Sequence, residues 1–201
     1  EISLKGKNRS WFERRLIRNI KQQLRGLPFS KVHLSAARIF CFGIEKSQWD
    51  NYSNRLKKVM GIKHAILMDQ LNSDMDIIKE SAAFQLQRVK FETFRVTTKR
   101  QFKEFPLTSQ QINEEVGKHL QSLYLKSVDL KNAEVNMIIE LVKGMAYVGY
   151  QRVHGYGGLP VGTSEHAVSM ISSGIDSPVA SFEMLRRGVN LSYVHFHSFP
   201  A

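Results

Sequence analysis

The spacing of apolar side chains over residues 1–70 predicts two helices and several short strands. In the first helix, apolar residues recur at every fourth position, so that one face packs inward. These residues are Phe12, Leu16, Ile20 and Leu24. Ser10 and Glu13 have the spacing of a capping box at the start of this helix. Shorter apolar runs predict strands at residues 31–34, 38–42 and 63–68 and a second helix at residues 48–60.

Taken in chain order, these elements give the succession α-β-β-α-β. Residues 1–4 read as the end of a further strand, and adding it gives the β-α-β-β-α-β order of a ferredoxin-like arrangement. We therefore expect an N-terminal ferredoxin-like domain over residues 1–70, lacking a few residues at its start.

The middle of the chain predicts a second α/β domain, over residues 71–165. Helices are expected at residues 75–89 and 109–123, the latter with a serine cap, and strands at residues 91–98, 134–142 and 145–150. Lys143 and Gly144 have the composition of a hairpin turn between the last two strands. A loop rich in Gly and Pro, residues 157–164, is expected to be a plain joint to the last segment.

The last segment, residues 166–201, predicts the beginning of a further α/β sheet. Residues 168–171 have the length and β-branched content of a strand, and Ser172, Ser173 and Gly174 interrupt it. The fold class is therefore α/β throughout, with an α+β N-terminal part.

A helix is expected directly after this turn. Asp176 or Ser177 is suited to cap it, Pro178 to occupy its first position and Gly188 to lie just past its end. Such a loop brings backbone N–H groups and the positive end of a helix dipole to one point, where a phosphate group is stabilised. The alternative is an ordinary strand-to-helix turn.

The chain carries 29 Lys and Arg against 18 Asp and Glu, and this excess is uneven. Residues 1–70 hold 15 basic and 5 acidic side chains, residues 71–165 hold 12 and 11, and residues 166–201 hold 2 and 2. The asymmetry indicates a polyanionic partner for the N-terminal third, with nucleic acid favoured over a membrane surface. A solvated basic face without a partner is the alternative.

Two further features bound the class of protein. No apolar run reaches the roughly 18 residues of a membrane span and no signal peptide is recognised, so a cytoplasmic protein without membrane contact is expected. Cys41 is the single cysteine, which excludes an internal disulfide framework and a cysteine-based zinc site. Because it lies in an apolar strand, a buried thiol is expected rather than a reactive one.

Residues 172–177, Ser-Ser-Gly-Ile-Asp-Ser, resemble the SGGxDS pyrophosphate loop (PP-loop) of ATP pyrophosphatases that adenylate an oxygen before replacing it. The departure is Ser173, where that family has glycine. Glycine is used where backbone approaches a ligand closely, so the Ser173 side chain either crowds a phosphate or donates a hydrogen bond to it. A G-x-x-x-x-G-K-[ST] phosphate loop is excluded, because the nearest candidate, residues 157–163, lacks the lysine.

Residues 94–100, Phe-Arg-Val-Thr-Thr-Lys-Arg, followed by Ser109 and the helix that contains residues 112–117, resemble a THUMP domain, the RNA-binding module of several tRNA-modifying enzymes. Together with the loop and with residues 2–9, 158–163 and 194–198, they resemble the tRNA 4-thiouridine synthetases (tRNA sulfurtransferases, the ThiI family). The resemblance covers essentially the whole chain in the family's order. It implies a ferredoxin-like domain, a THUMP domain and a PP-loop catalytic domain.

By this resemblance, the protein uses ATP with Mg²⁺ to place sulfur on a uridine of tRNA. A cysteine desulfurase would supply the sulfur, and the same protein would serve thiazole synthesis for thiamine. The resemblance assigns pyrophosphate stabilisation to Ser172, Ser173, Gly174 and Ser177, and a catalytic or magnesium-assisting role to Asp176. It places Met170, Ile171, His195 and Phe196 around the adenosine; for His195 the alternative is a strand histidine packed in a core.

Basic side chains in the first two domains are expected to contact phosphates and to position tRNA without reading its sequence. They are Lys5, Lys7, Arg9, Arg14, Arg15, Lys99, Arg100 and Lys103. Trp11 or Tyr156 is a candidate for stacking on an unpaired base.

The last segment has about 36 residues, too few for a stable domain, and it holds no cysteine to carry sulfur. We therefore expect a truncated PP-loop domain, and a chain that binds RNA without completing sulfur transfer. Two alternatives stay open: a non-catalytic THUMP-type tRNA-binding fragment, and another PP-loop tRNA-modifying ligase. Whether two copies form a homodimer is left open by the sequence.

Overall fold

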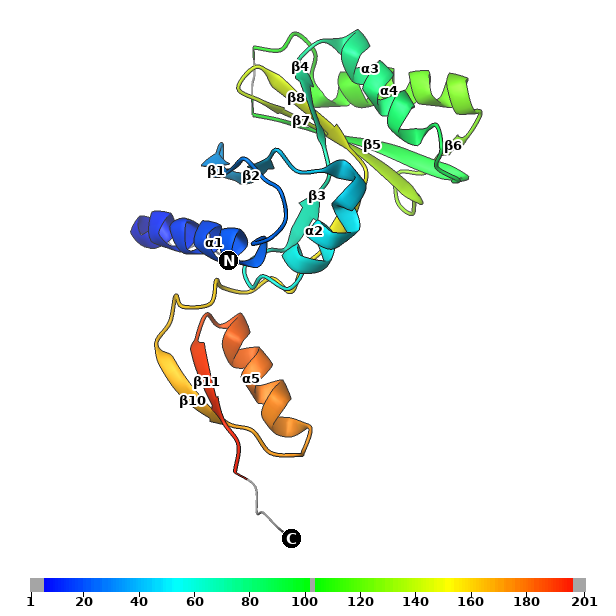
Figure 1. The fold of residues 1–201 in the computed structure, drawn as a ribbon. Coiled ribbons are helices and arrows are strands. Elements are labelled where there is room, and N and C mark those ends of the chain that lie inside the picture. Colours follow the sequence, from blue (N-terminus) through cyan, green and yellow to red (C-terminus); the bar gives the residue numbers. More distant parts are fainter. Residues whose placement is uncertain (1–5, 102–103, 197–201) are drawn as a thin grey trace. The chain divides into compact units, whose positions relative to one another are not determined.

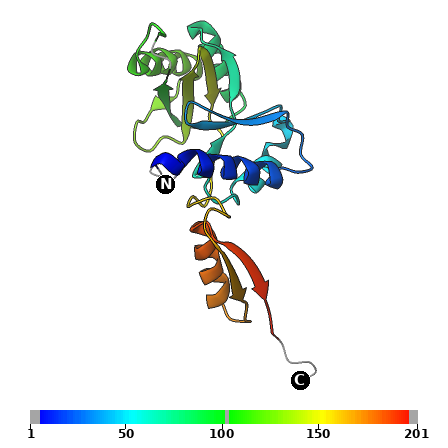
Figure 2. The same cartoon turned by 90° about the vertical axis from the view of Figure 1, so that its left-hand side faces the viewer.

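The computed structural model describes residues 6–101 and 104–196, which fall into two compact units (Figures 1 and 2). The N/C unit combines residues 1–65 with residues 153–201, and the middle unit contains residues 66–152. Both are mixed α/β structures, as the sequence predicts. The predicted three-domain division, with boundaries at residues 70 and 165, stays a prediction.

The first part of the N/C unit has the predicted order of elements. A 3₁₀ turn, η2 (Gly6–Asn8), leads into α1 (Arg9–Gln23), then β1 (Lys31–Ser35), β2 (Arg38–Phe42), η3 (Lys46–Gln48), α2 (Trp49–Leu56) and β3 (His64–Ile66). β1 and β2 form an antiparallel hairpin, and β3 pairs with β9 (Arg152–His154). The strand expected at residues 1–4 lies outside the described residues.

The core of this part forms because α1 presents its predicted apolar face. Leu16, Ile20 and Leu24 are buried with Val32 of β1 and Tyr52 of α2. The predicted capping box is wrong: Asn8 is the N-cap, and its side chain makes no capping hydrogen bond to the helix. Instead, the carboxylate of Glu13 accepts from Nε of Arg9 at 2.6 Å, so it is not available to the helix end.

The middle unit is built on a five-stranded sheet with the order β4-β8-β7-β5-β6. Its elements are β4 (Asp69–Asn72), α3 (Met75–Leu86), β5 (Thr93–Arg100), α4 (Ser109–Tyr124), β6 (Ser127–Val128), β7 (Val135–Val142) and β8 (Met145–Gly149). β5 is parallel to β6 and β7, whereas β8 is antiparallel to β7 and β4. Buried residues of α3 and α4 share one core with residues of β5, β7 and β8.

The hairpin between β7 and β8 turns at Lys143 and Gly144, as predicted. Their φ angles are 50° and 77°, and a two-residue turn with both angles positive matches the twist of the strands. Both positive angles are needed, which explains the glycine.

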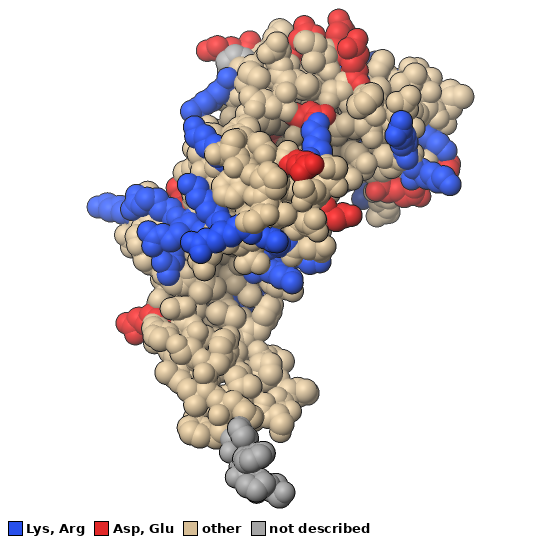
Figure 3. Space-filling view, viewed as in Figure 1, with Lys and Arg blue, Asp and Glu red and all other residues tan. Residues whose placement is uncertain are grey.

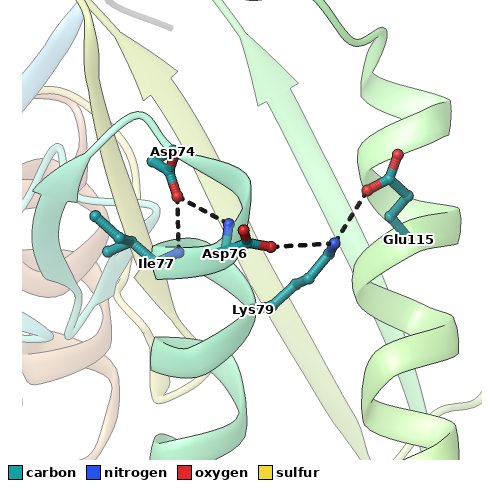
Figure 4. Close-up of polar contacts among 5 residues, drawn as sticks. All are labelled: Asp74, Asp76, Ile77, Lys79 and Glu115. Carbon is teal, nitrogen blue, oxygen red and sulfur yellow. Dashed lines mark hydrogen bonds and ion pairs between the residues drawn. The ribbon is translucent and has the colours of Figure 1, made fainter.

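Local hydrogen bonds fix the starts of both helices in this unit. At α3, Oδ1 of Asp74 accepts from the backbone N of Asp76 at 2.9 Å and of Ile77 at 3.1 Å (Figure 4). At α4, the capping residue is Thr108 in a capping box with Gln111, so the cap predicted at Ser109 is displaced by one residue. Each cap satisfies amides that have no partner within the helix.

An ion-pair bridge joins the same two helices. Nζ of Lys79 lies 3.7 Å from Oδ1 of Asp76 and 3.2 Å from Oε2 of Glu115 (Figure 4). Since Asp76 is mostly exposed, we expect this bridge to contribute little to stability.

The C-terminal part of the N/C unit is a β-α-β element. β10 (His166–Met170) is followed by α5 (Asp176–Arg186) and by β11 (Asn190–Val194), which pairs in parallel with β10. Gly188 lies just past α5 with φ +85°, as the sequence predicts. None of the helices in residues 6–101 and 104–196 combines the length and apolar character that crossing a bilayer requires.

Candidate functional site

The residues expected around a nucleotide meet at one edge of the β10–β11 pair. Met170 and Val194 are register partners at the carboxyl ends of the two strands. Just beyond them, Nδ1 of His195 lies 2.7 Å from the carbonyl oxygen of Ile171. Ligands of open α/β sheets bind at this edge.

A pair of serines closes the turn between β10 and α5. Oγ of Ser177 accepts from the backbone N of Ser172 at 3.1 Å and lies 3.2 Å from Oγ of Ser172. Oγ of Ser172 in turn accepts from the backbone N of Gly174 at 3.3 Å. The two hydroxyl groups therefore hold residues 172–177 as one closed turn.

This network leaves the start of α5 without a side-chain cap. The N-cap is Ile175, so the expected cap at Asp176 or Ser177 is wrong, and Pro178 occupies the third helical position rather than the first. Ile175 has no polar side-chain atom with which to cap the helix, and the Ser177 hydroxyl is bonded to Ser172. The structure gives the amides of Asp176 and Ser177 no acceptor within the described residues. Free amides at the start of a helix are suited to bind an anion.

The turn is open to solvent. Ser172, Ser173, Gly174 and Asp176 are exposed and Ser177 is half-buried. Met170 and Phe196 are 71% and 77% exposed, so apolar surface lies beside the turn. His195 is exposed as well.

The backbone accepts the serine that replaces the expected glycine. Ser173 is not among the residues with positive φ, so its side chain causes no backbone strain. A Cβ added to Gly174 would meet only Oγ of Ser172, at 3.5 Å. Within the described residues, neither position requires glycine in the absence of a ligand.

The predicted phosphate contacts fall into three groups. Lys5 and Lys103 lie outside the described residues. Lys7, Arg14 and Lys99 are exposed, and the described residues give them no hydrogen bond or ion pair.

The remaining three make contacts within the protein. Arg9 pairs with Glu13, and Nε of Arg15 donates to the carbonyl oxygen of Val161 at 3.0 Å. Nη1 of Arg100 donates to the carbonyl oxygens of Phe105, at 3.1 Å, and Leu107. These two arginines therefore stabilise the chain's own loops.

Basic side chains also gather on α1 at positions that were not singled out. Arg18, Lys21 and Arg25 are exposed on the helix or just after it, and Figure 3 shows Lys and Arg side chains over α1. They follow Arg14 at intervals of three or four positions, and this helical spacing in the sequence could have identified them as part of the same basic face.

Three other predicted features are located by the structure. Trp11 and Tyr156 are both 46% exposed, and each contacts one neighbouring ring edge-on, at centroid distances of 5.0 Å. Cys41 is half-buried, and burial raises the pKa of its thiol to about 11. A thiol with this pKa is a poor nucleophile at neutral pH.

Comparison with protein families gives a consistent assignment along the chain. Residues 1–65 match the ThiI ferredoxin-like domain, residues 72–150 the THUMP domain, and residues 162–201 the family described as thiamine biosynthesis protein (ThiI). The fold and the loop thus define a THUMP-domain protein joined to the start of a PP-loop domain.

Curated relatives agree with this class. A probable tRNA sulfurtransferase of Listeria innocua is 37% identical over 203 residues, and one of Clostridium kluyveri is 39% identical over 201 residues. The matches cover 100% of this chain but 50% and 51% of the relatives, so the chain spans about half their length. The chain belongs to the ThiI family of tRNA sulfurtransferases.

Solved structures share the fold. A 4-thiouridine synthetase in complex with RNA and bound ATP is 34% identical, with a TM-score of 0.81 over 100% of this chain and 51% of that chain. PH1313 from Pyrococcus horikoshii Ot3 is 30% identical, with a TM-score of 0.84 over 94% of this chain and 66% of that one. TrmN from Thermus thermophilus, 15% identical with a TM-score of 0.59 over 90% and 61%, shares the fold alone.

Proposed function

We propose that the protein containing this chain is an ATP-dependent tRNA sulfurtransferase that replaces the 4-oxygen of a uridine with sulfur. The observation that carries the proposal is the exposed turn at residues 172–177, which serine hydroxyls close and which leads into helix amides that have no acceptor among the described residues. The relatives' names, and the ATP and RNA bound to the solved 4-thiouridine synthetase, support it.

In this proposal the turn binds the phosphates of ATP. Ser172, Ser173 and Gly174, with the Ser177 hydroxyl and the first amides of α5, would stabilise the charge that develops on departing pyrophosphate. Met170, Ile171, His195 and Phe196 would surround the adenosine, for which the exposed apolar edge of β10 and β11 is suited.

Asp176 is the acidic side chain at this turn. Its carboxylate is exposed in the first turn of α5, and one carboxylate together with substrate phosphates is a common environment for Mg²⁺. Asp176 would hold the ion, which would supply charge neutralisation at the phosphates. Asp176 would also orient the loop.

The uridine oxygen is a poor leaving group and must first be activated. In the proposed reaction it attacks the α-phosphate of ATP and expels pyrophosphate, and a sulfur nucleophile then displaces AMP. Cys41 is unsuited to carry that sulfur, because its thiol is half-buried with a raised pKa. A cysteine desulfurase in the cytoplasm is the proposed sulfur source, and sulfur transfer for thiamine thiazole synthesis is proposed as a second role.

We propose that tRNA binds through exposed cations of the first two family domains. Lys7, Arg14 and Lys99 are free for phosphates among the described residues, and Lys5 and Lys103 are proposed to join them. Arg15 and Arg100 instead donate to backbone carbonyls of the chain itself. Since counterions are released at each phosphate contact, tRNA affinity should fall steeply with salt. Binding that stays constant from low to high salt would contradict this assignment.

The decisive experiment gives the complete protein ATP, Mg²⁺, a sulfur donor and tRNA, and measures thiouridine absorbance. We expect thiolated tRNA, and a loss of about 10²-fold in rate for Asp176→Asn with tRNA binding retained. Binding without any modified base would favour the non-catalytic alternative. A modified base without sulfur would favour another PP-loop ligase.

A further inference from the structure

The glycine- and proline-rich loop at residues 155–164, here called the strap, is more than a plain joint. Towards residues 57–63 it forms a ladder of backbone hydrogen bonds. Gly61 N donates to the carbonyl oxygen of Gly157 at 2.6 Å, and Gly157 N donates to that of Ile62 at 2.9 Å. A further bond runs from Gly155 N to the carbonyl oxygen of Lys63 at 3.1 Å.

The other side of the strap closes the end of α5. The backbone amides of residues 162–164 all donate to the carbonyl oxygen of Gly188, at 2.8, 3.0 and 3.0 Å. Leu159 N donates to the carbonyl oxygen of Arg186 at 2.8 Å. The last carbonyls of a helix have no partner within it, so the strap supplies the donors that α5 lacks.

Two side chains of α1 hold the strap from a third direction. Nε of Arg15 and Nδ2 of Asn19 both donate to the carbonyl oxygen of Val161, each at 3.0 Å. These residues lie four positions apart and therefore on the same helix face. Together they use both lone pairs of one carbonyl group.

The fit around Arg15 is close. A Cβ added to Gly162 would lie 1.7 Å from Nη2 of Arg15, and its φ of +81° also favours glycine. Gly158 is constrained in the same way, since an added Cβ would lie 2.3 Å from the carbonyl oxygen of Arg186. These glycines serve close packing, which the loop composition alone did not indicate.

We propose that Arg15 and Asn19 are positioning residues: they fix the strap, and through it α5, whose first turn carries the proposed nucleotide loop. Arg15 then acts on the reaction through the strap instead of binding an RNA phosphate. The tRNA-binding and activity readouts of this inference rest on the proposed function, whereas the hydrogen-exchange readout does not.

The first test is amide hydrogen exchange on the complete protein. Asn19→Asp keeps the side-chain shape but replaces the donor by an acceptor, and Arg15→Ala removes the other donor. We expect the amides of residues 162–164 to exchange about tenfold faster in both variants, the change that a loss of ~1.4 kcal/mol in local stability produces. Arg14→Ala, the exposed neighbour, is the matched control and should leave them unchanged.

The second test separates positioning from RNA binding. The slope of tRNA affinity against salt concentration, both on logarithmic scales, should be unchanged in Arg15→Ala. In Arg14→Ala the magnitude of this slope should fall by about one. In the thiolation assay, Asn19→Asp should lower kcat with the KM for tRNA unchanged.

Unchanged exchange in both strap variants would overturn the inference, as would an Arg15→Ala slope that falls like that of Arg14→Ala. If Arg15→Ala does not fold, Asn19→Asp decides the matter through exchange. A protein without thiolation activity would contradict the proposed function, while the exchange and salt measurements would still test the roles of Arg15 and Asn19.

Discussion

Ser172 and Ser177 share their hydroxyl groups across the turn before α5, and this pairing governs what the turn offers a ligand. A serine at a helix start ordinarily bonds to the helix's own amides. Here Ser177 bonds backwards to Ser172, so the first amides of α5 stay available. The residue types of this turn were evident from the sequence. Their hydrogen bonds were not, because they depend on the backbone path of residues 172–175.

The serine pair predicts a specific loss on substitution. Ser177→Ala removes the acceptor for Ser172 N, so the turn loses its closure and the affinity of the complete protein for ATP should fall about tenfold. Titration calorimetry with ATP measures this. The control is Ser122→Ala, an exposed serine of α4 outside the proposed nucleotide site, which should leave the affinity for ATP unchanged. Equal losses in both variants would contradict the assigned role of Ser177.

Cys41 predicts a shifted pH dependence of alkylation. Because burial raises its pKa to about 11, the rate of iodoacetamide labelling should keep rising beyond pH 10. In urea-unfolded protein the labelling profile should have its midpoint near pH 9.0. Between pH 9.0 and about 11 the folded thiol keeps a proton that the unfolded thiol has lost, so the free energy of unfolding should decrease over this interval. Cys41→Ser should lack this decrease.

At the scale of elements, strong periodicity was a reliable guide and boundaries were not. The apolar face of α1, the strands β1 and β2, and the β7–β8 hairpin are confirmed. The strand predicted at residues 63–68 is instead the short β3, and β4 follows it with a different partner. β4 was missed because its sequence, DQLN, has one apolar residue and no strand pattern.

The caps show why element ends are hard to predict. Glu13, Thr108 and Ser177 have suitable neighbours at several positions, and the choice among hydrogen-bond partners is made by local geometry. α2 likewise ends at Leu56 rather than at residue 60. Spacing in the sequence lists the candidates without selecting one.

The cap of α3 gives a test at this scale. Asp74→Ala leaves two amides of the first turn without their acceptor, so the free energy of unfolding should fall by about 1 kcal/mol. Urea denaturation, followed by a probe in the middle unit, measures this. Asp76→Asn, which breaks only an exposed ion pair, should cost less than about 0.5 kcal/mol. A larger loss in the free energy of unfolding for Asp76→Asn than for Asp74→Ala would contradict the capping role assigned to Asp74 (Figure 4).

At the scale of the whole molecule, the uneven distribution of basic and acidic residues along the chain can be counted directly from the sequence. The first 70 residues carry 15 basic and 5 acidic side chains, and the structure shows several of the basic ones exposed on α1. What the sequence could not show is which cations are engaged internally. Arg15 and Arg100 each donate to backbone carbonyls, and that depends on the folded paths of distant or neighbouring loops.

This distribution predicts a difference between two matched triple variants. Replacing Lys7, Arg14 and Arg18 by Gln should lower the slope of tRNA affinity against salt by about three, since each removes one phosphate contact. The control replaces Lys118, Lys131 and Lys143 of the middle unit, which are also exposed. It should lower the slope by less than about one. Filter binding over a salt series measures the slope for both triple variants. If the two variants lower the slope equally, the proposal that tRNA phosphates bind mainly to the basic side chains of α1 is contradicted.

The carbonyl oxygen of Gly188 accepts hydrogen bonds from three strap amides, so the two ends of α5 are not held equally firmly. Its carboxyl end is anchored by several backbone bonds, while the turn at its amino end is closed, within the described residues, by the hydroxyls of Ser172 and Ser177. A phosphate arriving at the amino end can therefore tighten residues 172–177 without displacing the helix axis. In the proposed function, nucleotide binding would then be a local rearrangement of residues 172–177 beside a helix whose carboxyl end is fixed.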